Sequence, residues 1–130
     1  MAWQDWKKMS DESLGAALQI MSDKPRSAAN RFYFGSYQAV SALLLYSGEK
    51  PPDGREAWAH ADTPGMIVNN LKGLIPKRGD REDMKDRLGL LYKARVSADY
   101  VTGDDLKTSI NQIRKDATFL ITVARGILPK

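Results

Sequence analysis

The side chains best suited to chemistry in this chain gather around Arg95, which occupies an apolar position of a helical pattern. That pattern recurs at spacings of four and three residues: Met84, Leu88, Leu91 and Ala98. A guanidinium keeps its charge, so at such a position it needs partners or water. Asp99 lies one helical turn after Arg95 on the same side, and Tyr100 follows it. This run is a candidate site.

Two interpretations of Arg95 are open from the sequence. In the functional one, Arg95 holds a phosphate or stabilises a pentacoordinate phosphoryl transition state. In the structural one, Arg95 pairs with Asp99, and the Tyr100 hydroxyl caps the end of the helix. Both use the same residues, so the surroundings of Arg95 must decide between them.

Arg31 and Tyr33 form a second pair of candidates, within an aromatic run of the chain. Arg31 projects away from the apolar face of its helix, on the side that Gln38 shares. It either forms a surface or interhelical salt bridge or lines a cleft together with Arg95 and Tyr33.

His60 is the only histidine, and it lies in the long connector of residues 49–62. It could act as an acid or base, but a loop histidine that touches a helix end is the simpler interpretation. No cysteine and no second histidine supports a metal site, and no glycine-rich phosphate loop follows a strand. We therefore expect no metal and no cofactor.

Helical periodicity and capping residues predict an all-α fold, an up-and-down bundle of four to five helices. The expected helices cover residues 5–21, 25–47, 63–75, 80–98 and 104–127. The second is apolar around most of its circumference, which predicts a central position or a second subunit against it. Gly35, Ala39 and Ala42 form a small-residue patch on it, and this patch predicts a homodimer.

Length and composition fit one domain that covers residues 1–130, since 130 residues with 42% hydrophobic content can bury a core without disulfides. The N-terminus has no signal-peptide core, and no apolar run is long enough for a bilayer. We expect a cytoplasmic protein without membrane contact. The net charge of +4 favours anionic partners only mildly. Residues 72–87 mix basic and acidic side chains, which indicates a solvated helix face more than a nucleic-acid footprint.

The run of residues 29–44 resembles the second-helix signature of HEPN-domain proteins (higher eukaryotes and prokaryotes nucleotide-binding). Their pattern is Arg-x-Tyr-Tyr-Ala-x-Phe-x-Ala-x-x-Ala-Leu-Leu, and this chain has Arg31-Phe32-Tyr33-Phe34-Gly35-Ser36-Tyr37 followed by Ala39 and Ala42-Leu43-Leu44. Gly48, His60 and the run from Leu88 to Tyr100 follow in the order and spacing of that family. The resemblance covers residues 27–100.

This resemblance implies a helical bundle, commonly dimeric. Many members are metal-independent endoribonucleases of toxin–antitoxin, phage-defence or RNA-processing systems, and others are binding modules without catalysis. Active members carry an arginine and, four to six residues later, a histidine. Arg95 matches the arginine, but Tyr100 stands where the histidine would be, and tyrosine has too high a reference pKa for a base at neutral pH.

From these residues we expect a nucleic-acid- or nucleotide-associated domain of a toxin–antitoxin or phage-defence system. Arg95 would contact phosphate and Asp99 would orient it, while Tyr100, Arg31 and Tyr33 line the cleft. One alternative is a metal-independent endoribonuclease that uses Arg95 with Tyr100 or His60. Another is a catalytically silent interaction module with a structural Arg95–Asp99 pair. The expected partners are RNA or a nucleotide, a second copy of the chain, and a cognate antitoxin or nucleotidyltransferase-like protein.

Overall fold

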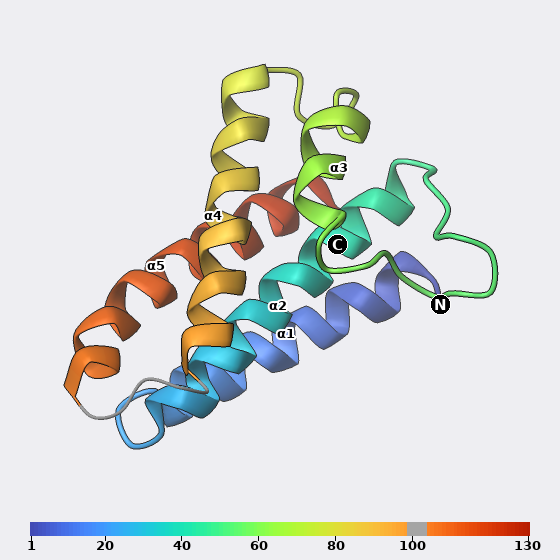
Figure 1. The fold of residues 1–130 in the computed structure, drawn as a ribbon. Helices are drawn as coiled ribbons and strands as arrows, with labels where there is room; N and C mark the ends of the chain where they lie inside the picture. Colours follow the sequence, from blue (N-terminus) through green and yellow to red (C-terminus); the bar gives the residue numbers. More distant parts are fainter. Residues whose placement is uncertain (99–103) are drawn as a thin grey trace.

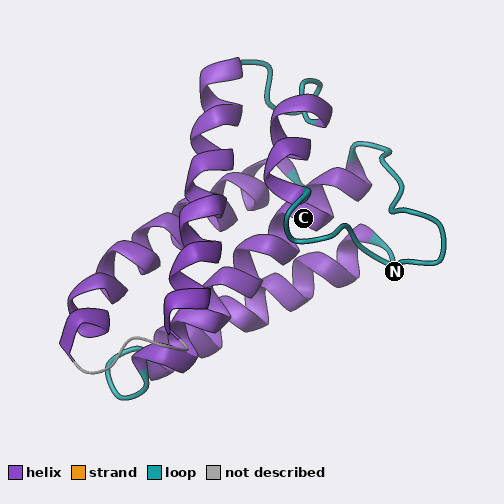
Figure 2. Cartoon of the chain, in the orientation of Figure 1, coloured by secondary structure: helices purple, strands orange, loops and turns teal. Residues whose placement is uncertain are grey.

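A computed structural model describes the backbone of residues 1–98 and 104–130 and the side chains of residues 1–98 and 109–130. Within these ranges the chain forms helices and no strand (Figure 2). The helices are α1 (Trp3–Ile20), α2 (Pro25–Tyr46), α3 (Thr63–Asn70), α4 (Arg78–Ala98) and α5 (Asp104–Ile127). The predicted all-α bundle is confirmed.

Helix α2 is the central element of the bundle, and it packs against α1, α5, α4 and α3. Figure 1 shows α1 and α2 side by side, with α5 behind them and α4 crossing α2 at a steep angle. The broad apolar face of α2 is buried: Ala29, Phe32, Tyr33, Tyr37, Val40, Leu43 and Leu44. The central position expected from the apolarity of this helix is therefore filled by helices of the same chain.

The small-residue patch on α2 permits close packing inside the bundle. A Cβ atom on Gly35 would lie 3.2 Å from Ile121 Cδ1 of α5 and 3.4 Å from Ser13 Cβ of α1. Ser10 Oγ donates a hydrogen bond to the Gly35 carbonyl over 2.7 Å. Ala39 and Ala42 are buried as well. Neighbours within the chain account for this patch, so it no longer argues for a homodimer.

The helix boundaries differ from the expected ones mainly between α3 and α4. Helix α3 ends at Asn70, and a turn in which the Ile75 N–H donates to the Leu71 carbonyl follows it. Helix α4 begins at Arg78, which places Asp80 in its first turn. A carboxylate there stabilises the helix because it interacts favourably with the helix dipole. The buried Arg81 donates to the carbonyls of Ile75 and Pro76 over 2.9 and 3.0 Å. Arg81 thereby stabilises the turn between α3 and α4, at residues where a longer third helix was expected.

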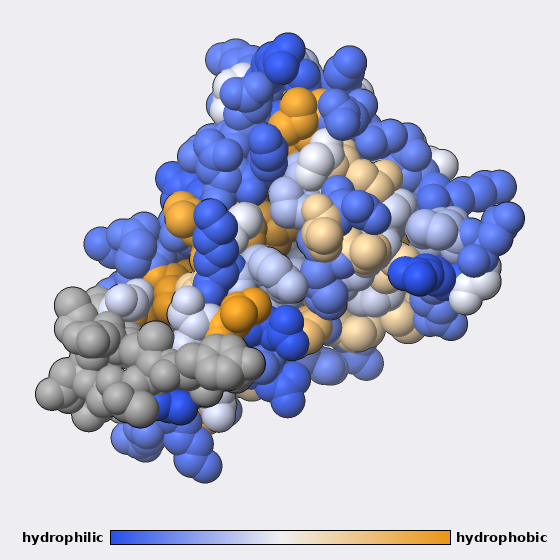
Figure 3. Space-filling view, in the orientation of Figure 1, coloured by the Kyte–Doolittle hydropathy of each residue, from blue (hydrophilic) through white to orange (hydrophobic). Residues whose placement is uncertain are grey.

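Hydrophilic side chains cover most of the face drawn in Figure 3, and hydrophobic residues are exposed there in separate patches. Leu18 follows the apolar spacing of Leu14 and Ala17 in α1, but 47% of it is exposed. Among the described residues no helix has the length and apolarity that crossing a bilayer requires.

Candidate functional site

Arg95 lies near the C-terminal end of α4 and points toward α2. The apolar members of its stripe, Met84, Leu88, Leu91 and Ala98, are buried as expected. Arg95 itself is half-buried, and its guanidinium carbon lies 5.0 Å from the ring centre of Phe34 and 5.8 Å from that of Tyr33. A cation at this distance is attracted by the negative face of an aromatic ring. The position of Arg95 is therefore stabilised by aromatic rings of α2.

No carboxylate of the described residues forms an ion pair with Arg95. Its Nε is buried and has no hydrogen-bond partner among them. Asp99 and Tyr100, the expected partners on the same helix, lie outside the described residues. Within the described part, Arg95 thus keeps an uncompensated positive charge beside an aromatic cluster.

His60 joins this cluster from the connector between α2 and α3. Its Nδ1 and the Tyr33 hydroxyl are hydrogen-bonded over 2.5 Å, and its ring centre lies 4.4 Å from that of Tyr37. Phe34 and Tyr92 also contact the His60 ring, the latter stacked at 15°. The connector therefore brings His60 to the middle of α2, rather than to a helix end.

Two further hydrogen bonds hold this part of the connector against α2 and α3. The Tyr37 hydroxyl donates to the Trp58 carbonyl over 2.5 Å, and Trp58 itself is buried. Thr63 Oγ1 donates to the Ala59 carbonyl over 2.9 Å. His60 therefore sits between two anchored points of the connector, which restricts where its ring can move.

Burial and neighbouring charge perturb both partners of the His60–Tyr33 hydrogen bond. Burial lowers the pKa of His60 below its ordinary value, and the nearby positive charge of Arg95 lowers it further. Burial, with Tyr37 as a second cause, raises the pKa of Tyr33 far above its ordinary value, although Arg95 partly opposes this. At neutral pH His60 is consequently uncharged and the Tyr33 hydroxyl keeps its proton.

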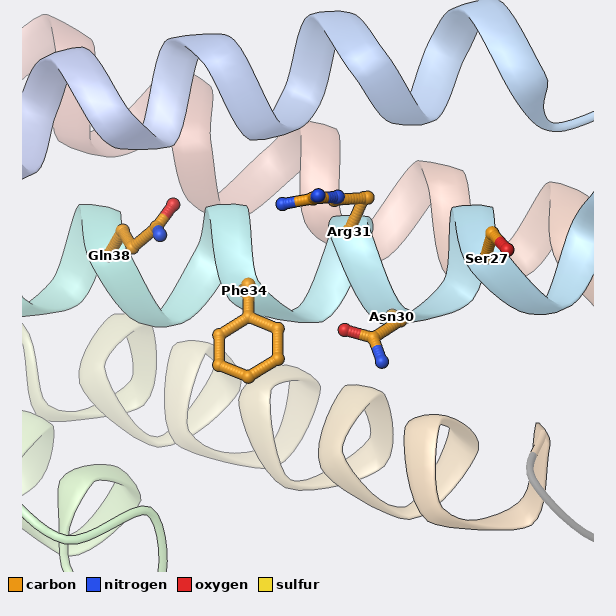
Figure 4. Close-up of a pocket in the computed structure, with 5 residues that line it drawn as sticks. All are labelled: Ser27, Asn30, Arg31, Phe34 and Gln38. Carbon is orange, nitrogen blue, oxygen red and sulfur yellow. The ribbon is translucent and has the colours of Figure 1, made fainter.

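Arg31 borders a separate hollow of about 480 Å³ on the outer side of α2 (Figure 4). The other residues that line it are Ser27, Asn30, Phe34 and Gln38. The shared side of Arg31 and Gln38 is confirmed. Arg31 is exposed and forms no ion pair with any described residue. Phe34 belongs both to this hollow and to the cluster around Arg95, so the two arginine sites are neighbours.

The aromatic residues at the surface of the site differ from those that the sequence predicted. Tyr33 is buried and its hydroxyl is engaged by His60, so it supports the site from inside instead of lining a cleft. Phe34 and Tyr92 contact the cluster at its more open side, and neither was a predicted site residue. Tyr92 precedes Arg95 by one helical turn, and this spacing could have identified it.

Neither a metal site nor a known relative adds to this description. In the described part of the chain, no three His, Cys, Asp or Glu side chains lie close enough to hold a metal ion. Comparison of the chain with protein-family models, with curated proteins and with solved structures gave no match in any of the three. Function must therefore be argued from the geometry of the site.

Proposed function

We propose that the chain binds the phosphate of an RNA or a nucleotide at Arg95, with Phe34 and Tyr92 as the aromatic surface beside it. The observation that carries this proposal is the guanidinium of Arg95, which lies on the Phe34 ring without a carboxylate partner among the described residues. Proteins that bind single-stranded nucleic acids combine such cations with aromatic side chains on which bases stack. Arg31 adds a second exposed cation on the other side of Phe34.

A direct binding experiment tests this proposal. Fluorescence anisotropy with labelled single-stranded RNA, and competition by nucleotides, compares the wild type with Arg95→Lys. Lysine keeps the charge but lacks the planar pair of donors that fits a phosphate. We expect affinity to fall roughly tenfold, the loss of one charge-assisted hydrogen bond.

Arg125→Lys is the matched control for this experiment. Arg125 is an exposed arginine of α5 whose Nη2 lies 2.6 Å from Asp11 Oδ1. This substitution should leave affinity unchanged, and thermal unfolding of both variants checks their folding. Failure of the wild type to bind any RNA or nucleotide would contradict the proposal.

A second candidate function, metal-independent RNA cleavage, is favoured by the position of His60. The family motif expects its histidine shortly after the arginine, and here a histidine reaches the same cluster from the connector. With its pKa lowered, His60 is uncharged, and its Nε2 can act as a base in the tautomer whose Nδ1–H donates to the Tyr33 hydroxyl oxygen. Arg95 would stabilise the phosphoryl transition state.

Cleavage assays in EDTA test this candidate. The wild type should cut single-stranded RNA, whereas His60→Gln and Arg95→Ala should each lose most of the activity. Cleavage by His60→Gln at the wild-type rate would remove His60 from the mechanism. Tyr100, the other candidate base, lies outside the described residues, so Tyr100→Phe is the corresponding comparison.

The wider biological setting rests on the resemblance to HEPN-domain proteins. On that basis we place the chain in a toxin–antitoxin or phage-defence system in the cytoplasm, as a homodimer or with an antitoxin or nucleotidyltransferase-like partner. Sedimentation that shows only monomer would argue against the homodimer. The rival is an interaction module without a ligand, in which Arg95 pairs with Asp99.

A further inference from the structure

The two ring nitrogens of His60 have different surroundings. Nδ1 is hydrogen-bonded to the Tyr33 hydroxyl inside the aromatic cluster. Nε2 forms no hydrogen bond with any described residue and is not buried. Each nitrogen of an imidazole is a donor or an acceptor and needs a partner or water. The Nε2 atom is therefore open to a ligand that approaches from solvent.

Arg95 is open on the same side of the cluster. Only its Nε is buried, and the two terminal nitrogens of its guanidinium form no hydrogen bond with any described residue. The guanidinium carbon lies 5.0 Å from the Phe34 ring centre, and the His60 ring centre lies 5.7 Å from the same point. Charges act on one another over ~8 Å at physiological salt. A phosphate that binds Arg95 is therefore within range of a charge on His60.

The groups around His60 include no acidic partner for it. Those that face it are two tyrosines of α2 and, from α4, a tyrosine and an arginine: Tyr33, Tyr37, Tyr92 and Arg95. Helix α3 has no titratable side chain. Of the connector's carboxylates, Glu56 and Asp62 are nearest in sequence; both are exposed and neither forms an ion pair with His60. A proton on His60 would thus add a positive charge that the described fold leaves unpaired.

We propose that His60 is a second phosphate contact of the site at Arg95 and that it acts in its protonated form, so that single-stranded RNA binds more tightly at mildly acidic pH. The inference rests on the proposed function and names the regulation of that site. A phosphate on Arg95 offsets the positive charge that disfavours a proton on His60, and the protonated ring donates from Nε2 to a phosphate oxygen. The Tyr33 hydroxyl is compatible with this state, because its oxygen can accept from Nδ1–H.

The composition of the chain makes this effect measurable. His60 is the only histidine, and the chain has no cysteine. Its imidazole is therefore the one side chain whose ordinary pKa lies between that of carboxyl groups and that of the amino terminus. If the protonated form binds phosphate more tightly, binding must raise the pKa of His60 by the same free energy. Affinity and proton uptake thus give two measurements of one coupling.

Fluorescence anisotropy with oligo(U) at about pH 7.5 and about pH 5.5, in the same salt, tests this inference on the full chain. The probe has no terminal phosphate, because such a group titrates near pH ~6, and its label is insensitive to pH. The wild type should bind roughly three- to tenfold more tightly at the lower pH, the gain of one charge-assisted phosphate contact. His60→Gln keeps a side chain that can form hydrogen bonds but cannot take up a proton, so it should bind equally at both pH values.

Gly15→His provides the matched control. Gly15 is exposed on α1, and an added Cβ atom would have no neighbour within 4 Å. Among the described residues, α1 packs against α2 and α5 but not against α4. The double variant with His60→Gln and Gly15→His has one imidazole, as the wild type has, but on a helix away from Arg95. It should bind equally at both pH values, which separates a contact at the site from a general gain of positive charge.

The wild type alone supplies a second measurement, which does not depend on how a variant folds. NMR of the single imidazole follows the pKa of His60, which should rise when oligo(U) is bound. Equal affinity at the two pH values, or an unchanged pKa on binding, would overturn the inference and leave the proposed function standing. The wild-type pH dependence in His60→Gln, or its return in the double variant, would overturn the inference as well. No binding at either pH would overturn both.

Discussion

Two arginines of α4, Arg87 and Arg95, lie on aromatic rings but differ in their charged neighbours. Arg87 lies 4.2 Å from the Phe119 ring centre, donates to Asp116 over 3.0 Å, and pairs with Asp83 over 3.2 Å. Arg95 lies on Phe34 and has no carboxylate partner in the described part of the chain. The same side chain is therefore paired within the fold at one position, and at the other its charge has no carboxylate partner among the described residues.

This difference follows from what faces each arginine across the helix interface. Opposite Arg87, α5 presents the buried Asp116, which also accepts from Gln112 Nε2 over 3.2 Å. A buried carboxylate is costly unless it is paired, so the fold needs Arg87 as the partner of Asp116. Opposite Arg95, α2 and the connector present only uncharged rings. Nothing in the described fold would be left unpaired if that guanidinium bound something else.

The largest expected effect is on stability, from Arg87→Met. It leaves the Asp116 carboxylate buried with only Gln112 as a partner, and we expect a loss of roughly 2–3 kcal/mol in the free energy of unfolding. This is below the ~3–5 kcal/mol of a fully sealed pair, because 30% of the Arg87 side chain is exposed. Urea unfolding measures it. A loss below about 1 kcal/mol would contradict this expectation, because it would equal the contribution of an ordinary exposed ion pair.

Arg95→Met should cost much less stability, and so sharpens the comparison. Methionine retains the packing of the aliphatic stem, so the loss should be no more than about 1 kcal/mol, the size of a partly exposed cation–π contact. The same urea series measures both arginine variants. An equal loss of stability in Arg95→Met and Arg87→Met would mean that Arg95 has a partner on which the fold depends. That result would support the interpretation in which Arg95 pairs with Asp99.

The smallest expected effect is a pH dependence of stability through His60. Because its pKa is lowered in the folded state, the unfolded chain binds the proton more readily, and stability falls as pH drops through the ordinary histidine range. The free energy of unfolding, measured at several values from about pH 7 to about pH 5.5, covers this window. The window lies above the pH range in which carboxyl groups titrate. His60→Gln should remove the dependence and Arg95→Met should reduce it. An identical pH profile in His60→Gln and the wild type would assign the dependence to other groups.

The order of helices could be predicted because local signals agree along most of the chain. Pro25 opens α2 and Gly48, with φ +99°, follows its end. The apolar residues of α5 recur at spacings of four and three, from Leu106 to Ile127. Ile110, Ile113, Ala117, Leu120 and Ala124 are buried and Ile127 is half-buried, whereas the side chain of Leu106 lies outside the described residues. Prediction failed between α3 and α4, where the buried Arg81 donates to the carbonyls of Ile75 and Pro76, because no helical spacing indicates these contacts.

The candidate site was only partly predictable for the same physical reason. Arg95 was recognisable because a charge interrupts an apolar stripe. The contact between His60 and Tyr33 was not, since it depends on how a connector without periodicity folds back onto α2. No local pattern indicates that Arg95 of α4 would lie on the Phe34 ring of α2. The roles of Asp99 and Tyr100 remain predictions.

The salt dependence of RNA binding tests the central claim most directly. Each phosphate contact to a single strand contributes about 0.7 to the slope of log affinity against log salt concentration. If Arg95 contacts a phosphate, Arg95→Gln should lower this slope by about that amount, and Arg125→Gln, at an arginine already paired with Asp11, should leave it unchanged. A wild-type slope in Arg95→Gln, or an equal decrease in both variants, would contradict the account.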